Sequence, residues 1–231
     1  MPMKNVYWNH LDTLGNYGEK MLKIGITFRI TNADSYEETR DSLSHDWPIF
    51  LEKINAVPIW IPNSLSNLTT FLEQMKLDGI ILSGGDNIGQ FPIRDETEKK
   101  LINFAMKKNI PVLGVCRGMQ VLNEFFGGSN KILNNDDHVG NNHLVQVEHN
   151  SFSKLINSSE ITVNSFHRNI IPSSSLAKIL NPVALSKTDD TVEAFIHKEL
   201  PIIGVMWHPE REQKSFDEKI ISDIFNVKWM Q

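Results

Sequence analysis

PVLGVCRGMQ, residues 111–120, is an apolar run that passes through a Gly-x-Cys-x-Gly sequence into a helical pattern. A strand that leads at once into a helix predicts a tight turn at Cys116, and the flanking glycines leave room for its strained backbone. The thiol would stand at the N-terminus of that helix, where the helix dipole favours the thiolate, which is the attacking species. A lone cysteine is usually a small buried hydrophobe. Here the glycine spacing and the strand–turn–helix context indicate a nucleophile instead.

Strand-like and helical patterns alternate before this turn. Strands are predicted at residues 22–28, 57–61, 79–83 and 110–115, and helices at 36–55, from Asn63 or Ser64 to about 75, and at 95–108. The continuous apolar runs are typical of strands buried on both faces. Repeated βα units of this kind predict a parallel sheet with helices on both faces.

The second half of the chain has a different character. Separate strand-like runs lie at residues 144–147, 161–163, 192–196 and 202–206, divided by turn-rich segments such as 134–142, and a helix is predicted at 216–225. We therefore expect an α/β fold of three layers with a mostly parallel sheet. Residues 21–231 are expected to form a single domain, with residues 1–20 as an N-terminal extension of unknown role.

Composition excludes several classes of function. The 231 residues carry a net charge of −5, which argues against a nucleic-acid surface, because phosphate binding needs clustered lysine and arginine. No window approaches the ~18 consecutive apolar residues of a membrane span, and no signal peptide is read at the N-terminus. The single cysteine fits a reducing compartment. We expect a cytoplasmic protein that binds neither nucleic acid nor a membrane.

A cysteine nucleophile needs a base, and His208 is the candidate. It directly follows the buried strand predicted at residues 202–206, and sites in open α/β sheets gather at the carboxyl ends of strands. Glu210 lies two residues further on, so in an extended segment it points to the same side and is expected to fix the histidine tautomer. The sequence thus predicts the catalytic triad Cys116, His208 and Glu210.

These motifs together resemble the class I glutamine amidotransferases, and more closely their free-standing γ-glutamyl hydrolase branch, which includes γ-glutamyl-γ-aminobutyrate hydrolases. Gly-x-Cys-x-Gly-x-Gln and the later His-Pro-Glu carry the likeness. Further matches are Ser83-Gly84-Gly85-Asp86, Arg94-Asp95-x-x-Glu98, Phe126-Gly127-Gly128 and the Asn-Ser-x-His sequence at residues 164–167. The resemblance covers about residues 22–210 and implies a flavodoxin-like fold.

The resemblance also implies roles for single residues. The backbone N–H groups of Gly85 and Arg117 are expected to form the oxyanion hole. A small γ-glutamyl substrate is expected to be held by six residues, namely Gln120, Asn164, Ser165, Phe166, His167 and Arg94.

No cofactor is expected, because Gly84-Gly85 lacks the lysine and hydroxyl residue of a phosphate-binding loop. A metal is not expected either. Asp136, Asp137, His138, His143 and His149 lie close together in sequence, but they form no tight ligand pair on a helix, and loop carboxylates are usually solvated.

The leaving group and the partners stay open at this stage. The implied reaction is hydrolysis of a γ-glutamyl amide through a thioester, with release of glutamate. Candidate substrates are γ-glutamyl-γ-aminobutyrate-like amides and γ-glutamyl-CDP-amidate, which some compact relatives cleave during assembly of capsule phosphoramidate. The alternative is a glutaminase subunit that delivers ammonia to a partner synthase. A homodimer is one option for its assembly. A catalytically inactive binding module is disfavoured by the intact triad.

Overall fold

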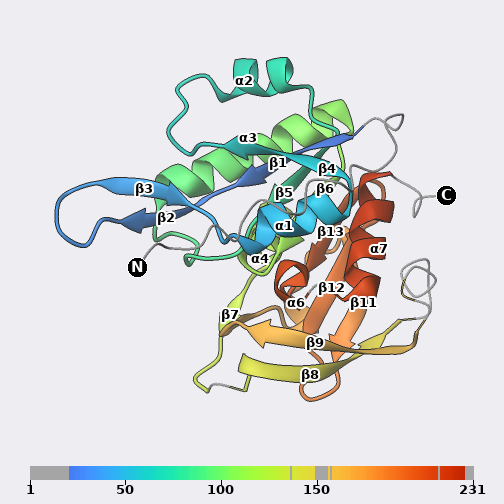
Figure 1. Ribbon diagram of the computed structural model, residues 1–231. Helices are drawn as coiled ribbons and strands as arrows, with labels where there is room; N and C mark the ends of the chain where they lie inside the picture. Colours follow the sequence, from blue (N-terminus) through green and yellow to red (C-terminus); the bar gives the residue numbers. More distant parts are fainter. Residues whose placement is uncertain (1–20, 136, 149–155, 157, 213, 227–231) are drawn as a thin grey trace, which may run out of the picture.

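The computed structural model describes residues 21–135, 137–148, 156, 158–212 and 214–226. Nine strands form its central sheet: β1 (Leu22–Thr27), β4 (Ala56–Ile61), β5 (Gly79–Leu82), β6 (Val112–Val115), β8 (Val139–Val147), β9 (Glu160–Phe166), β11 (Leu180–Ser186), β12 (Val192–His197) and β13 (Ile202–Val205). Their order is β4-β1-β5-β6-β13-β12-β11-β8-β9 (Figure 1). The first five in this order are parallel, and the last four continue the sheet in antiparallel fashion.

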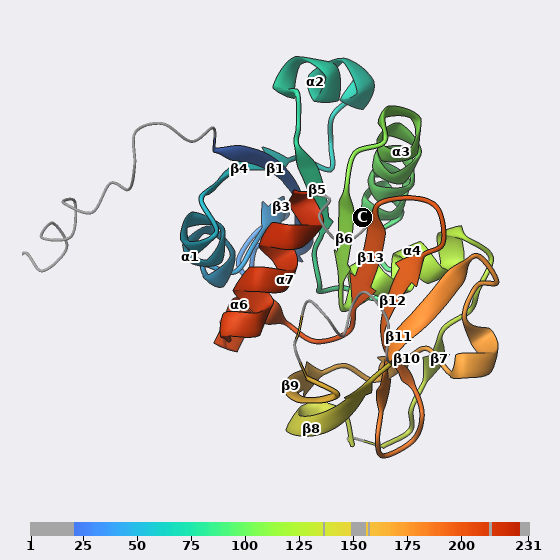
Figure 2. The ribbon, with the colours of Figure 1, turned by 90° about the vertical axis from the view of Figure 1, so that its right-hand side faces the viewer.

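Helices cover both faces of the parallel part. They are α1 (Asp46–Lys53), α2 (Leu68–Met75), α3 (Pro92–Lys108), α4 (Arg117–Phe125), the short α6 (Pro209–Glu212) and α7 (Ser215–Phe225). Figure 2 shows α1 and α7 on one side of the sheet and α3 and α4 on the other. Two buried apolar clusters lie on the two faces of the sheet. Successive residues of β5 contribute to different clusters, because side chains alternate along a strand. Ile81 belongs to the same buried cluster as Trp47 and Ile224, whereas Ile80 belongs to the cluster that contains Leu101. The predicted three-layer α/β fold is confirmed.

The helix predicted at residues 36–55 is wrong over its first part. There the chain forms the antiparallel hairpin of β2 (Arg29–Asn32) and β3 (Thr39–Ser42), and α1 begins only at Asp46. The β3 residues are mostly exposed and polar, so they offer no apolar face that a helix could bury, and their backbone groups pair with β2 instead.

Two smaller differences have local causes. Helix α2 is capped by Asn67, whose side chain accepts the Thr70 N–H at 3.1 Å, and not by the predicted Asn63 or Ser64. Strand β11 was not predicted, because Asn181 and Pro182 interrupt its apolar pattern. β7 (Lys131–Ile132) and β10 (Asn169–Ile170) pair as a separate two-stranded antiparallel sheet, and a short 3₁₀ turn follows at Ser173–Ser175.

The topology sets where a site can form. Strands β5, β6 and β13 are neighbours in the sheet and run parallel, so the segments that follow them meet at one edge. Those segments begin at Ser83, Cys116 and Met206. Among the described residues, no helix is both long and apolar enough to cross a membrane.

Candidate active site

The turn that carries Cys116 joins β6 directly to α4. Its backbone has φ 51° and ψ −107°, a conformation that residues with side chains rarely adopt. The Cys116 N–H donates to the Val205 carbonyl oxygen at 2.8 Å, which ties the turn to β13. Gly118 lies so close to β5 that a Cβ there would stand 2.0 Å from the Leu82 carbonyl oxygen. The turn is therefore sharp because the neighbouring strands admit only backbone at this point.

His208 follows β13, beside the cysteine turn, and Glu210 lies in the short helix α6 and not in the extended segment that was predicted. His208 Nδ1 lies 2.8 Å from Glu210 Oε1. The ring also makes a hydrogen bond with the Cys116 side chain, and because Nδ1 is engaged by Glu210, Nε2 is the nitrogen that faces the sulfur. Burial alone would lower the pKa of His208, but the charge of Cys116 and the hydrogen bonds to Cys116 and Glu210 outweigh burial and raise the pKa to about 9. The ring is thus protonated near neutral pH and is ready to act as an acid.

The Asn164 side chain hydrogen-bonds to the main chain of His208. Its Nδ2 donates to the His208 carbonyl oxygen at 2.8 Å, and its Oδ1 accepts the His208 N–H at 2.8 Å. Ser165 is also directed away from the site, since its hydroxyl donates to the His138 carbonyl oxygen at 2.6 Å. The prediction that Asn164 and Ser165 contact the substrate is therefore corrected: both side chains are buried and hydrogen-bond to the protein's own backbone.

Arg94 lies beneath the loop that follows β5 and not in the cavity. Its Nη2 donates to the carbonyl oxygens of Ser83 at 2.8 Å and Gly84 at 3.0 Å, and its other nitrogens pair with Asp86 and Glu98 at 3.1 Å each. Burial lowers the pKa of Arg94, against the effect of Glu98. The predicted substrate contact is corrected here too, because the fully buried guanidinium is engaged by the loop.

The side chain and the backbone N–H of Arg117 point to different surroundings. Its side chain is buried and pairs with Asp95 and Glu98. Its backbone N–H is the first of helix α4, and the first N–H groups of a helix have no partner within the helix. Gly85, with φ 108°, lies on the loop that Arg94 braces, and both Gly85 and Arg117 line the same cavity as Cys116.

A cavity of about 860 Å³ opens over the cysteine. Of the predicted site residues it is lined by Cys116, His208, Glu210, Gly85, Arg117, Gln120, Phe166 and His167. Three further arginines line it that the sequence analysis did not single out: Arg29, Arg168 and Arg211. All three are exposed cations. They come from separate segments, so only the fold brings them together.

Three lining side chains are held in place by the protein. Gln120 Nε2 donates to the Asn169 carbonyl oxygen at 3.2 Å, and His167 Nδ1 lies 3.1 Å from the same oxygen. Burial lowers the pKa of His167 to about 4, while Glu193 acts in the opposite direction. Phe166 is 44% exposed, lies with its ring edge-on to His208 and carries the Arg211 guanidinium 4.1 Å above its ring centre. The cavity therefore combines a neutral imidazole, an amide and an aromatic face.

Comparison with known proteins adds a family and several relatives. The Peptidase C26 family model matches residues 23–210. A γ-glutamyl-CDP-amidate hydrolase from Campylobacter jejuni subsp. jejuni serotype O:2 is 33% identical over 211 residues, which cover 88% of this chain and 98% of that protein. A γ-glutamyl-γ-aminobutyrate hydrolase from Escherichia coli O157:H7 is 31% identical over 192 residues, covering 67% of this chain and 73% of that protein.

A solved structure is similar over most of the chain. It is that of a protein from Thermoplasma acidophilum described as a putative GMP synthase subunit, with a TM-score of 0.69 and 27% sequence identity, covering 90% of this chain and 94% of that one.

Proposed function

This chain belongs to the Peptidase C26 family, and on that premise we propose that it cleaves a γ-glutamyl amide through Cys116, His208 and Glu210. Membership of the family makes the chain a hydrolase. The observation that carries the proposal is that Cys116, His208 and Glu210 are linked by hydrogen bonds and line one cavity.

The proposed reaction has two halves. The Cys116 thiolate attacks the γ-carbonyl carbon, and the C=O electron pair moves onto an oxyanion that the Gly85 and Arg117 N–H groups bind. His208 then gives its proton to the amide nitrogen as the C–N bond breaks, which leaves a thioester and a free amine. A water molecule gives its proton to His208 and its oxygen to the thioester carbon, so glutamate leaves and the thiolate returns.

Electrostatics supports the roles of His208 as the acid and of the two backbone N–H groups as oxyanion donors. A histidine with a pKa near 9 is a stable acid at neutral pH, and amide cleavage needs an acid because the amine is a poor leaving group. Each oxyanion donor is worth about 3–4 kcal/mol in comparable sites. Gln120, Phe166 and His167 remain the residues proposed to hold the glutamyl group, because they line the cavity.

The charges at the cavity favour an anionic leaving group. A cavity of about 860 Å³ is much larger than a glutamyl group needs, and Arg29, Arg168 and Arg211 line it. Guanidinium groups bind phosphate oxygens with two parallel hydrogen bonds. We therefore favour γ-glutamyl-CDP-amidate, the substrate in the name of the Campylobacter relative, over a γ-glutamyl-γ-aminobutyrate-like amide.

The experiment compares four γ-glutamyl compounds by mass spectrometry of released glutamate: glutamine, γ-glutamyl-γ-aminobutyrate, a γ-glutamyl polyamine and γ-glutamyl-CDP-amidate. The wild type should cleave the CDP-amidate far faster than the others, and Cys116→Ser should cleave none. Arg168→Gln should lower kcat/KM for the CDP-amidate about 10-fold or more and leave the γ-aminobutyrate compound unaffected. Arg40→Gln is the matched control, because Arg40 is exposed on β3 and pairs with Glu38.

One alternative has its own support. The similar solved structure is described as part of a GMP synthase, so a glutaminase subunit that supplies ammonia to a partner synthase remains the second candidate. Slow cleavage of glutamine alone, stimulated by a synthase, would favour it. Cleavage by Cys116→Ser at the wild-type rate would refute both functions.

A further inference from the structure

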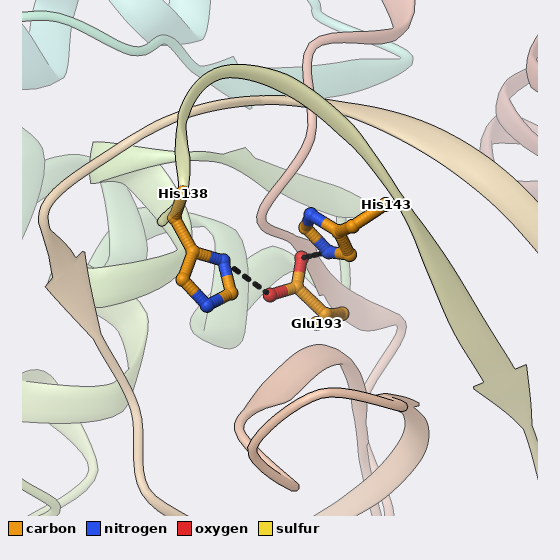
Figure 3. Close-up of side chains that lie close together, drawn as sticks. All are labelled: His138, His143 and Glu193. Atoms are coloured by element: carbon orange, nitrogen blue, oxygen red, sulfur yellow. Dashed lines mark ion pairs between the residues drawn. The ribbon is translucent and has the colours of Figure 1, made fainter. Parts of the chain in front are cut away.

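A cluster of ionisable side chains lies beside the cavity and has no part in the proposed reaction. It consists of His138, His143 and Glu193, which point toward one another in Figure 3. His138 comes just before β8, His143 lies within β8, and Glu193 belongs to β12. His167, at the end of β9, completes the surroundings of the carboxylate. Three strands of the antiparallel part of the sheet, β8, β9 and β12, and the residues at their ends therefore bring polar groups to one point.

The carboxylate of Glu193 is buried without a hydrogen-bond donor. Its exposure is 0%, and neither oxygen accepts a hydrogen bond from any described residue. The nearest nitrogens are His143 Nε2 at 3.5 Å from Oε2, and His138 Nδ1 and His167 Nε2, both at 3.8 Å from Oε1. A buried charge of this kind is strongly destabilising unless a cation or a proton compensates it.

In His138 and His167, the hydrogen bond made by the nitrogen on the far side of the ring decides which nitrogen carries the hydrogen. His138 Nε2 lies 3.0 Å from Asp189 Oδ2, and an ionised carboxylate only accepts, so this nitrogen carries the hydrogen. His167 Nδ1 likewise must donate to the Asn169 carbonyl oxygen. In the neutral rings, His138 Nδ1 and His167 Nε2 therefore present lone pairs to a carboxylate that also offers only lone pairs.

We propose that His138, His143 and Glu193 bind a divalent metal ion, with Zn²⁺ as the expected occupant. Lone pairs that converge on one point are what a cation requires, and the unpartnered nitrogens and oxygens supply them. Two imidazoles and one carboxylate are a donor set that zinc accepts, with one position left over. His167 Nε2 lies nearby, 3.8 Å from Glu193 Oε1.

The spacing of the ligand atoms is close to that of such a site. Tetrahedral Zn²⁺ with bonds of about 2.0–2.1 Å places its ligand atoms about 3.3 Å apart. The Glu193 oxygens lie 3.5 and 3.8 Å from the two imidazole nitrogens, within about half an ångström of this spacing. All three ligand atoms lie within 4.8 Å of one another.

The surroundings match those of a metal centre. A histidine ligand usually donates its other N–H to a carboxylate or a carbonyl oxygen, which fixes its tautomer and orientation. Asp189 does this for His138, and Asp189 is itself held by the Thr191 hydroxyl at 2.8 Å. The ion would join β8 to β12 and steady His167, which lines the catalytic cavity, so its role is to hold that wall in place.

This inference replaces the expectation of no metal. Of the acidic and histidine residues that lie close together in sequence, Asp136 and His149 fall outside the described residues, and His138 and His143 belong to the cluster. The decisive ligand, Glu193, is fifty residues away in sequence and could not be associated with them by spacing.

The test measures zinc binding by the full-length chain. Protein carrying Cys116→Ser, which removes the active-site thiolate as a competing ligand, is freed of metal with a chelator and titrated with Zn²⁺ by calorimetry. We expect one equivalent to bind. His143→Ala should weaken binding by more than about 100-fold, and Asp189→Asn by about 10- to 100-fold. His45→Ala is the matched control and should bind as before, since His45 is exposed at the start of α1.

X-ray absorption at the zinc edge gives a second readout that needs no cluster variant to fold. Wild-type protein loaded with one equivalent should show nitrogen and oxygen ligands with an imidazole signature and no sulfur. Absence of binding in the Cys116→Ser protein, sulfur in the wild-type coordination shell, or unchanged affinity in folded His143→Ala would each overturn the proposal. In those cases a proton shared within the cluster, and not a metal, balances Glu193.

Discussion

Replacing Gly84 by alanine tests whether the observed position of the His208 ring is the catalytic one. A Cβ on residue 84 would lie 2.8 Å from His208 Cε1 and 3.5 Å from Cys116 Cβ. Gly84 does not have a positive φ, so alanine adds no backbone strain. Ordinary contact begins at 3.4 Å, so the ring or the loop must yield by at least 0.6 Å, the difference between 3.4 and 2.8 Å.

Such a shift disturbs the reaction whichever group moves. The ring is fixed at 2.8 Å from Glu210 and contacts Cys116, so it cannot move without loosening one of these contacts. If the loop moves, the proposed oxyanion donor Gly85 moves with it. Because a misplacement of about 1 Å can cost about 100-fold in rate, we expect kcat/KM to fall about 10- to 100-fold, or about 1.4–2.7 kcal/mol.

The assay combines glutamate release with a readout that needs no substrate, the rate at which iodoacetamide alkylates Cys116. Both should fall in Gly84→Ala, while the far-ultraviolet spectrum stays native. Gly89→Ala is the matched control in the same loop: its φ is 86°, and a Cβ there meets nothing within 4 Å. It should lose about 1 kcal/mol of stability and keep full activity. Wild-type kcat/KM and alkylation in folded Gly84→Ala would refute the reasoning.

Three further predictions address buried groups. Asn164→Ala removes two hydrogen bonds to the His208 main chain, so it should cost about 2 kcal/mol in denaturant unfolding and lower kcat with little change in KM; a raised KM with unchanged kcat would instead indicate direct substrate contact. Since the pKa of His208 is raised to about 9, the ring keeps its proton below that pH, and kcat/KM should fall as pH rises through about 9; a pH–rate profile flat beyond pH 10 would exclude this acid. Burial raises the pKa of Asp217 from 3.8 to about 7, against the hydrogen bond from Trp207, so the folded state holds an extra proton between about pH 4 and 7 and loses stability as pH rises through that window. Asp217→Asn should therefore stabilise the protein at pH 8, by at most about 4 kcal/mol, and have little effect at pH 4, as thermal unfolding at the two values would measure.

Much of the reaction centre could be predicted because its determinants are local. The turn at Cys116 needs small residues on both sides, and the chain shows them as glycines at 114 and 118. His208 and Glu210 are two residues apart, so their 2.8 Å contact depends on very few backbone angles. The alternation of apolar strands and amphipathic helices likewise predicts a parallel sheet covered on both faces, because burial imposes different periods on the two elements.

Residues of the motif at 164–167 show where this reasoning stops. Whether a polar side chain of this motif faces the cavity or the backbone behind it depends on neighbours that are distant in sequence. Asn164 faces the main chain of His208, forty-four residues away, and His167 faces the cavity. The same limit applies to Arg94, which is buried under the loop after β5.

The sequence alone therefore determined the tight turn at Cys116 and the alternation of the parallel strands with their covering helices, since each depends on spacing within a short segment. It also determined the hydrolase class, through several motifs taken together. Only the tertiary structure decided that three arginines line the cavity, that Asn164 hydrogen-bonds to the His208 main chain and that histidines surround Glu193. These depend on the register of the antiparallel strands and on loops that meet across the sheet edge. Contacts of that kind are made between segments whose separation along the chain carries no periodic signal.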